Sequence, residues 1–253
     1  MPQKHYKNNS NSSHVSSGHS FGYQNIVYDD EHWALLKRLR EKTVFLMSAL
    51  ADFHLNTVVH GSIARGDVKT GSDIDIFIPE VQNSFTVETA LERAGIPVNN
   101  RFIVQATPMY AMKAHIEIDE LTTITFPLMN MRNVEREFYT FGGEITLSQL
   151  EANLQVAGVD KRLMLIEPNT VGHEESSVIG REAFVAKTLG ISIDTVLDRV
   201  HALTKRSTVG RTGVFLKKEL NNEETFELAL KRLSDLNPSI RRRQQQQNKK
   251  GFS

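Results

Sequence analysis

Two aspartates separated by one residue, Asp73 and Asp75, are the strongest candidates for chemistry in this sequence. They belong to the run Asp-Ile-Asp-Ile-Phe-Ile at 73–78, in which acidic and apolar residues alternate at the start. The alternation predicts a strand with both carboxylates on one face, roughly 7 Å apart, and the isoleucines on the buried face. Mg²⁺ prefers carboxylates together with phosphate oxygens. We therefore expect Asp73 and Asp75 to hold two Mg²⁺ ions for phosphoryl or nucleotidyl transfer.

The residues that precede these aspartates suit the phosphates of a nucleotide. Gly61 and Ser62 follow the short β-rich run at 57–60, with ten residues between them and Asp73. A glycine after a strand lets the backbone approach a phosphate without a Cβ clash, and Ser62 supplies a hydroxyl and an N–H. Arg65 and Lys69, in the following loop, offer positive charge. We expect these four residues to bind the nucleotide.

The stretch from His60 to Ile78 resembles the active-site signature of the DNA polymerase β superfamily of nucleotidyltransferases: a strand, Gly-Ser, about ten residues, then Asp-x-Asp on a second strand. It is similar to the archaeal CCA-adding enzymes and to the small "minimal" nucleotidyltransferases. The resemblance implies a mixed α/β sheet, a nucleoside triphosphate as substrate, two Mg²⁺ ions, and transfer of a nucleoside monophosphate with release of pyrophosphate.

The resemblance also implies a third carboxylate on a neighbouring strand, which helps to activate the attacking hydroxyl. Two residues compete for this role, and both belong to the run Ala-His-Ile-Glu-Ile-Asp-Glu at 114–120. Asp119 has the usual residue type but lies at the strand end, whereas Glu117 has hydrophobic flanks. We favour Asp119 as a catalytic and metal-binding residue and keep Glu117 as the alternative metal ligand. For either residue, a role as a solvated hairpin residue without catalytic function is an equally good interpretation.

Hydrophobic periodicity predicts the elements that position these residues. Asp29 or Asp30 is expected to cap a helix that extends to about residue 50, and a second helix over 85–94 ends at Gly95 and Pro97. Further strands are expected at 101–106, 111–118 and 122–126, the last two joined by a tight turn. These elements together predict a mixed sheet with helices around it.

The second half of the chain has a helical pattern from about residue 146. Helices at 176–189 and 194–205 around a short break resemble a helix-turn-helix, with a small hairpin or wing at 208–217 and a last helix at 223–235. Basic residues gather over 199–218 without any acid, which favours contact with RNA or DNA. A plain packing or dimerisation module is the alternative. The candidate nucleic-acid-binding residues are Arg199, Lys205, Arg206 and Arg211.

These patterns divide the chain into four parts. We expect a disordered tail at 1–25, a nucleotidyltransferase domain at 26–145, a mainly helical, winged helix-turn-helix-like domain at 146–238, and a basic disordered tail at 239–253. The chain has 30 basic and 30 acidic residues, but seven of the basic ones lie in the two tails, where no acid occurs. The middle of the chain is therefore acidic by the same number, which is unlike a general nucleic-acid binder.

Composition excludes several other classes of function. The chain has no cysteine, so disulfides, thiolate zinc sites and cysteine nucleophiles are excluded. It has no long apolar run and no apolar segment near its start, so we expect a cytoplasmic protein without membrane contact. The acceptor stays open among an RNA end, which we favour, and a protein side chain, as in antitoxin-type minimal nucleotidyltransferases that nucleotidylate proteins (AMPylation with ATP). A third alternative is a nucleic-acid-binding regulator whose transferase-like domain senses nucleotide.

Overall fold

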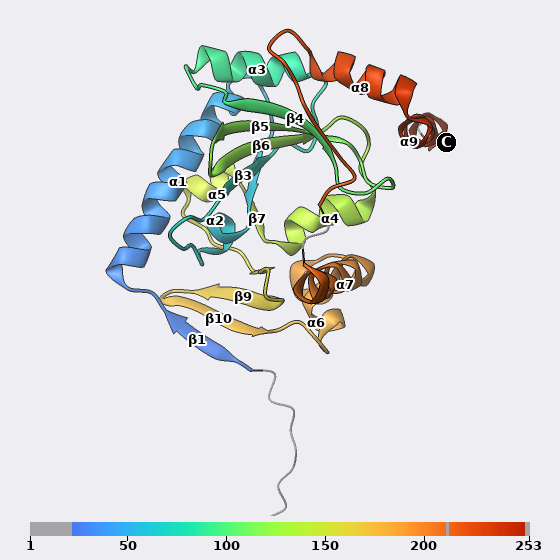
Figure 1. Cartoon of the computed structure of the whole chain (residues 1–253). Coiled ribbons are helices and arrows are strands. Elements are labelled where there is room, and N and C mark those ends of the chain that lie inside the picture. Colours follow the sequence, from blue (N-terminus) through green and yellow to red (C-terminus); the bar gives the residue numbers. More distant parts are fainter. Residues whose placement is uncertain (1–21, 211–212, 251–253) are drawn as a thin grey trace, which may run out of the picture.

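The computed structural model describes residues 22–210 and 213–250, whose strands form two sheets (Figure 1). The main sheet has seven strands and the small sheet has four. The strands of the main sheet, in spatial order, are β11 (Leu216–Glu219), β4 (Asn100–Gln105), β5 (Lys113–Asp119), β6 (Thr122–Pro127), β3 (Ile74–Phe77), β2 (Val58–His60) and β7 (Glu144–Thr146). The pair β3–β6 is parallel and the other pairs are antiparallel, so the sheet is mixed.

One face of the main sheet carries the largest hydrophobic core. Ile74, Ile76 and Ile78 are at most 1% exposed, as the alternation at 73–78 predicts. They pack in one cluster with residues of several helices. The first of these helices is capped by Asp29, which accepts a hydrogen bond from the backbone N–H of His32. The helices that contribute to this core are α1 (Asp30–Ala51), α2 (Ser62–Arg65), α3 (Ser84–Arg93), α5 (Leu147–Glu151), α8 (Phe226–Leu236) and α9 (Pro238–Lys250). This burial leaves the opposite face of the sheet for the polar side chains.

The opposite face of the main sheet carries Asp75 and is covered in part by α4 (Asn133–Phe141). Tyr139 of α4 stacks on Phe77 of β3, with ring centroids 3.6 Å apart. A short helix, α2 (Ser62–Arg65), follows β2 directly. Phe77 is two residues after Asp75 on the same strand, so the aromatic contact fixes α4 over the face of β3 that carries Asp75.

The small sheet is antiparallel and lies next to the main sheet (Figure 1). Its strands, in spatial order, are β1 (Gln24–Val27), β10 (Gly172–Ser177), β9 (Met164–Asn169) and β8 (Gly158–Val159). A second core joins it to α6 (Glu182–Leu189) and α7 (Ile193–Val209), with Leu165, Val185 and Val196 at its centre.

The two ends of the chain are exchanged between the two sheets. Strand β1, near the N-terminus, pairs with β10 of the small sheet. Strand β11, near the C-terminus, pairs with β4 of the main sheet. The expected domain boundary at residue 145 accounts for neither pairing, because each joins a strand from one half of the chain to a sheet of the other half.

A close backbone approach joins the two sheets. A Cβ on Gly158 of β8 would lie 2.5 Å from the backbone nitrogen of Gly143 and 2.6 Å from the carbonyl carbon of Gly142. Only a residue without a side chain fits there. The turn after α4 and the first strand of the small sheet are thereby held against each other.

Several expectations for the second half are wrong. Residues 158–177 form strands β8, β9 and β10, so this part is not mainly helical, and the expected helix over 176–189 begins only at Glu182. Two helices with a short turn at Gly190 do form, but the described residues of 208–217 form no hairpin with each other. Instead, α7 continues to Val209 and β11 joins the main sheet as an edge strand.

Residues 239–250 of the expected disordered tail belong to a helix, and residues 251–253 lie outside the described residues. Pro238–Lys250 form α9, because Ile240 is fully buried and Arg243 donates hydrogen bonds to the carbonyls of Met109 and Asn130. Of the expected tail at 1–25, residues 1–21 lie outside the described residues, and β1 begins at Gln24. Among the helices of the described residues, none is long and apolar enough to cross a membrane.

Candidate active site

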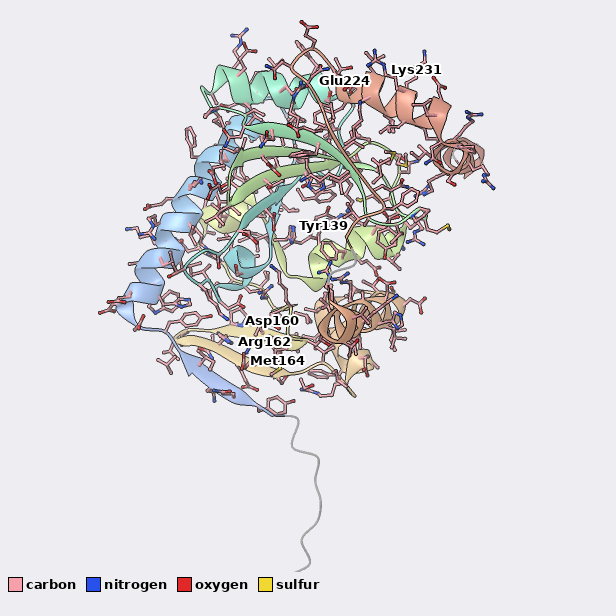
Figure 2. All side chains as sticks on the ribbon, in the orientation of Figure 1. Tyr139, Asp160, Arg162, Met164, Glu224 and Lys231 are labelled. Atoms are coloured by element: carbon pink, nitrogen blue, oxygen red, sulfur yellow. The ribbon has the colours of Figure 1, made fainter. Side chains whose placement is uncertain are left out.

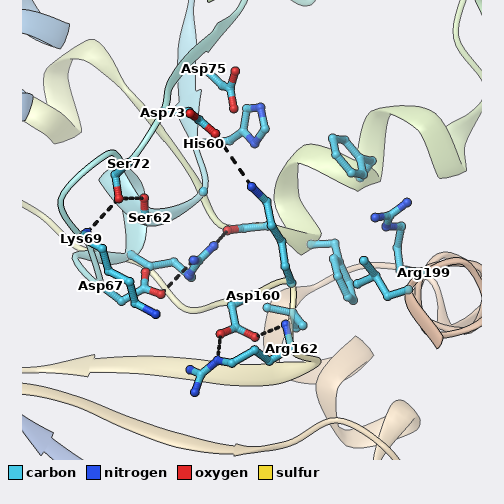
Figure 3. Close-up of a pocket in the computed structure, with 18 of the residues that line it drawn as sticks. His60, Ser62, Asp67, Lys69, Ser72, Asp73, Asp75, Asp160, Arg162 and Arg199 are labelled. Carbon is cyan, nitrogen blue, oxygen red and sulfur yellow. Dashed lines mark hydrogen bonds and ion pairs between the residues drawn. The ribbon is translucent and has the colours of Figure 1, made fainter. Parts of the chain in front are cut away.

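A pocket of about 440 Å³ lies where the two sheets meet (Figure 3). Figure 2 shows its two sides, with Tyr139 on the side of the main sheet and Asp160 and Arg162 on the side of the small sheet. The main sheet and α4 contribute the signature residues and aromatic side chains: His60, Gly61, Ser62, Arg65, Asp67, Lys69, Thr70, Gly71, Ser72, Asp73, Asp75, Phe138, Phe141 and Gly142. The small sheet and α7 contribute Val159, Asp160, Lys161, Arg162, Arg199, Leu203 and Arg206.

The residues expected to bind phosphate form a tight loop at one side of the pocket. Gly61 has a φ of +83°, which favours glycine, and its N–H donates to the carbonyl of Gly143 at 2.9 Å. The hydroxyl of Ser62 donates to that of Ser72 at 3.3 Å, and Ser72 also accepts from the backbone N–H of Lys69 at 2.8 Å. The loop is therefore fixed by its own hydrogen bonds, with no Cβ of residue 61 between the backbone and the pocket.

The two aspartates line the pocket as expected, but their surroundings differ. Asp73 is half exposed and lies 3.8 Å from the ammonium of Lys161, which the turn between β8 and β9 supplies. Asp75 is the second residue of β3 and lies deeper. Burial, followed by the charge of Asp73, raises the pKa of Asp75 to about 6, and the charge of Lys161 opposes this rise. A cation at this site would favour the ionised form of Asp75.

His60, just before the signature glycine, has a structural role. Its ring makes edge contacts with Tyr139 and Phe138, with centroids 4.9 and 5.9 Å apart. Burial, followed by the charges of Lys113, Arg65 and Lys161, lowers its pKa to about 3. The ring is therefore neutral at physiological pH and packs the floor beside Asp75.

Neither candidate for a third carboxylate reaches the pocket. Strand β6 lies between β3 and β5, and the register pairs Asp75 with Thr123 and Thr123 with Glu117. Glu117 is thus on the same face as Asp75 but two strands away, at about 10 Å from strand spacing alone, and it accepts a hydrogen bond from Asn100. Asp119 pairs with Lys42 at 2.6 Å, outside the pocket. The expectation that Asp119 or Glu117 completes the site is not met, because the strand next to β3 carries Thr123.

The two remaining carboxylates fit a divalent ion that is shared with a nucleotide. Among the described residues, no group of three or more histidine, cysteine or acidic side chains is arranged to hold a metal by itself. Mg²⁺ is commonly bound through one or two carboxylates together with substrate phosphates and water. Asp73 and Asp75 supply such a pair at the rim of a pocket large enough for phosphates.

The pocket is rich in cations, of which some are neutralised internally. Arg65 is 5% exposed and is bound by Asp67 and by the carbonyl of Gly142, so it holds the loop together. Arg162 pairs with Asp160 and Glu175. Arg65 nevertheless lines the pocket, so its contact with phosphate stays a prediction.

Only some of the basic residues of α7 line the pocket. Arg199 and Arg206 line the pocket, whereas Lys205 does not. Arg211 lies outside the described residues. The face of α7 that was expected to contact nucleic acid as a recognition helix is thus, in part, a wall of the same pocket as the aspartates.

Sequence reasoning missed the contributions of the small sheet. Asp160 accepts hydrogen bonds from the backbone N–H groups of Arg162 and Met164, and this turn presents Lys161 to Asp73. The charged run at 160–162 ahead of an apolar strand was the available signal of a turn. The spacing of this run did not connect it with the signature almost ninety residues earlier. The two segments come together only because the two sheets pack against each other.

The comparison with protein families agrees with this geometry. Residues 36–132 match the family model of the nucleotidyltransferase domain, a span that begins within α1 and continues past β6 and contains both aspartates. No curated protein and no solved structure gives a significant match to the chain. Residues 36–132 are therefore a nucleotidyltransferase domain of the DNA polymerase β type, and the chain is a transferase.

Proposed function

We propose that the chain is a magnesium-dependent enzyme that transfers a nucleoside monophosphate from a nucleoside triphosphate to the hydroxyl at an RNA end. The observation that carries the proposal is one pocket that holds Gly61 and Ser62, Asp73 and Asp75, and two arginines of α7. The first pair suits the triphosphate and the second suits the metal. The arginines suit a further anionic group on the acceptor.

In the proposed reaction, the acceptor oxygen attacks the α-phosphorus of the nucleotide. A new P–O bond forms, the bond between the α-phosphorus and the oxygen bridging to the β-phosphate breaks, and pyrophosphate leaves. The hydroxyl proton is released to water. Magnesium, when bound, neutralises charge on the phosphate oxygens. The protein orients the groups: Ser62 and Lys69 face the departing phosphates, and Lys161 stands beside the reacting centre.

The basic wall favours an RNA end over the other acceptors. A protein side chain brings no obligatory negative charge, whereas every RNA end has a phosphodiester next to its terminal hydroxyl. A regulator that only senses nucleotide has no need of paired aspartates at the pocket rim. We therefore place RNA first, and treat protein nucleotidylation and nucleotide sensing as outcomes of the test.

The test is the incorporation of label from α-labelled ATP, CTP, GTP and UTP with Mg²⁺, with total RNA and total protein offered in parallel. Wild type is compared with Asp73→Ala/Asp75→Ala. Label on RNA with wild type alone supports the proposal, and label on protein alone replaces RNA with a protein acceptor. An unlabelled result with both acceptors, alongside retained nucleotide binding, supports the sensing alternative.

A further inference from the structure

Two arginines on one face of α7 line the pocket without an anionic partner. Arg199 and Arg206 are seven residues apart, which places them two helical turns apart on the same side, with Leu203 between them. Neither forms an ion pair within 4 Å among the described residues, although Asp198 is near enough to act on Arg199 electrostatically. The Nε atom of Arg199 is buried and has no hydrogen-bond partner among the described residues. A buried donor without an acceptor is costly, so this site is suited to an incoming anion.

The position of Arg199 is fixed by the surrounding structure. Its guanidinium lies 4.8 Å from the ring centroid of Phe138 in α4. The start of α7 is tied to the same helix, because Ser192 and Thr195 both donate hydrogen bonds to the carboxylate of Glu137. Helix α7 is thereby held at a set distance from α4, and the arginine requires little further ordering when a ligand binds.

The charges of the pocket leave room for an anion beyond the nucleotide. Once the pairs made by Arg65 and Arg162 are set aside, the cations left are Lys69, Lys161, Arg199 and Arg206, and the acids left are Asp73 and Asp75. A nucleoside triphosphate bound with two magnesium ions adds little net charge. The excess of positive charge therefore remains for the acceptor.

The geometry of the reaction places the acceptor on the side of α7. The attacking and leaving oxygens lie roughly in line through the phosphorus. If the departing pyrophosphate lies by Ser62 and Lys69, the acceptor approaches from the opposite side of the aspartates. Figure 3 shows Ser62 and Lys69 on one side of the pocket and Arg199 on the other.

We infer that Arg199 and Arg206 bind the backbone phosphate adjacent to the accepting hydroxyl of an RNA end. The inference rests on the proposed function and deepens it, since it assigns the residues that select a phosphate-bearing acceptor. It also gives the basic face of α7 a role inside the active site in place of duplex recognition.

The experiment measures equilibrium binding of short single-stranded RNA by fluorescence anisotropy, without nucleotide. One RNA has a normal terminal phosphodiester and the other has a neutral methylphosphonate at that linkage alone. Wild type is expected to bind the charged RNA about tenfold more tightly, and Arg199→Gln and Arg206→Gln to lose that preference. Lys205→Gln, adjacent to Arg206 but outside the pocket, is the matched control and should keep it.

Each outcome decides the inference. Equal binding of the two RNAs by wild type, or an unchanged preference in both arginine variants, overturns it. Arg206 is exposed, so its variant remains informative even if thermal melting shows that Arg199→Gln does not fold. Arginine-dependent binding by a wild type that transfers no label to RNA would retain the phosphate site and reject the proposed function, so the two failures are distinguishable.

Discussion

Asp75 of β3 faces Thr123 of β6 across the parallel strand pair of the main sheet. A hydroxyl therefore stands next to the two pocket carboxylates, where a third carboxylate was expected. A divalent ion held by Asp73 and Asp75, as proposed, would take its remaining ligands from phosphate oxygens and water.

The first prediction follows from the presence of Thr123, in place of a third carboxylate, beside Asp75. Thr123→Asp adds a carboxylate beside Asp75, so we expect the variant to be less stable than wild type without metal and to gain more stability from Mg²⁺. Thermal melting with and without Mg²⁺ measures both effects. Thr125→Asp is the control, because Thr125 faces Phe77, two residues further along the same strands. An equal response of the two variants to Mg²⁺ would contradict the prediction.

The second prediction concerns the acids themselves. Asp73→Asn and Asp75→Asn should each lower nucleotidyl transfer by at least about a hundredfold, because each removes a charge that the metal and phosphates require. Asp119→Asn should retain activity, since Asp119 pairs with Lys42 on the surface. Loss of the ion pair between Asp119 and Lys42 should change the free energy of unfolding by no more than about 1 kcal/mol. Steady-state label incorporation and urea unfolding are the measurements, and an inactive Asp119→Asn protein that folds normally would restore Asp119 to the site.

The third prediction concerns the contribution of the small sheet to catalysis. Lys161→Gln removes the cation that lies 3.8 Å from Asp73, and we expect transfer to fall by about tenfold through kcat, with a smaller change in KM. Lys161→Arg should recover most of the activity because it restores the charge. Kinetics that leave kcat unchanged in Lys161→Gln would show that this lysine is only a surface residue.

The fourth prediction is a loss of stability in acid. Burial, followed by the charges of Lys113 and Lys217, lowers the pKa of His115 to about 4. The unfolded chain, with a histidine pKa near 6.5, then binds more protons than the folded one between about pH 6.5 and pH 4. Stability should therefore fall as the pH drops through this window, by about 2 kcal/mol at pH 5 from this group.

Urea unfolding of wild type and His115→Gln at pH 7 and pH 5 measures that loss. The variant should lose less stability on acidification than wild type does. His201→Gln, at an exposed position of α7, should behave as wild type. A wild-type loss that His115→Gln does not reduce would assign the acid sensitivity to other groups.

The fifth prediction tests the junction of the two sheets. Gly158→Ala places a methyl 2.5 Å from the backbone of Gly143, so we expect destabilisation of about 2 kcal/mol or more, with lower activity. Gly142→Ala is the control, because its nearest new contact would be an ordinary 3.5 Å. Gly158→Ala should melt at a clearly lower temperature than Gly142→Ala. Equal melting temperatures would mean that the junction accommodates the added methyl group.

Local patterns were sufficient to predict five strands of the main sheet and its signature, but not the edge strands β7 and β11. The alternation at 73–78, the glycine at 61 and the cap at Asp29 each act over a few residues, and the structure confirms strand, turn and helix there. The third carboxylate was mispredicted because strand order is a long-range property. The order of the strands places β6 between β3 and β5, and no local pattern specifies that order.

The small sheet was missed for a related reason. Its strands β9 and β10 contain few alternating apolar residues, and Glu174 and Glu175 look solvated in sequence. Glu175 is nevertheless buried, because it pairs with Arg162, and β1 supplies the edge that completes the sheet. Partners distant in sequence decide whether such a segment is a strand. The sequence therefore did not show that Arg199 and Lys161 line the same pocket as Asp73.

The exchange of chain ends constrains the order in which this protein can assemble during synthesis. Strand β1 emerges from the ribosome long before β10, with which it pairs, and the main sheet lacks its edge strand β11 until residues 216–219 have been made. Neither half can be finished while the other is still absent. No single cut yields two complete fragments, so we expect the chain to gain its final stability in one cooperative step, after β11 has been made.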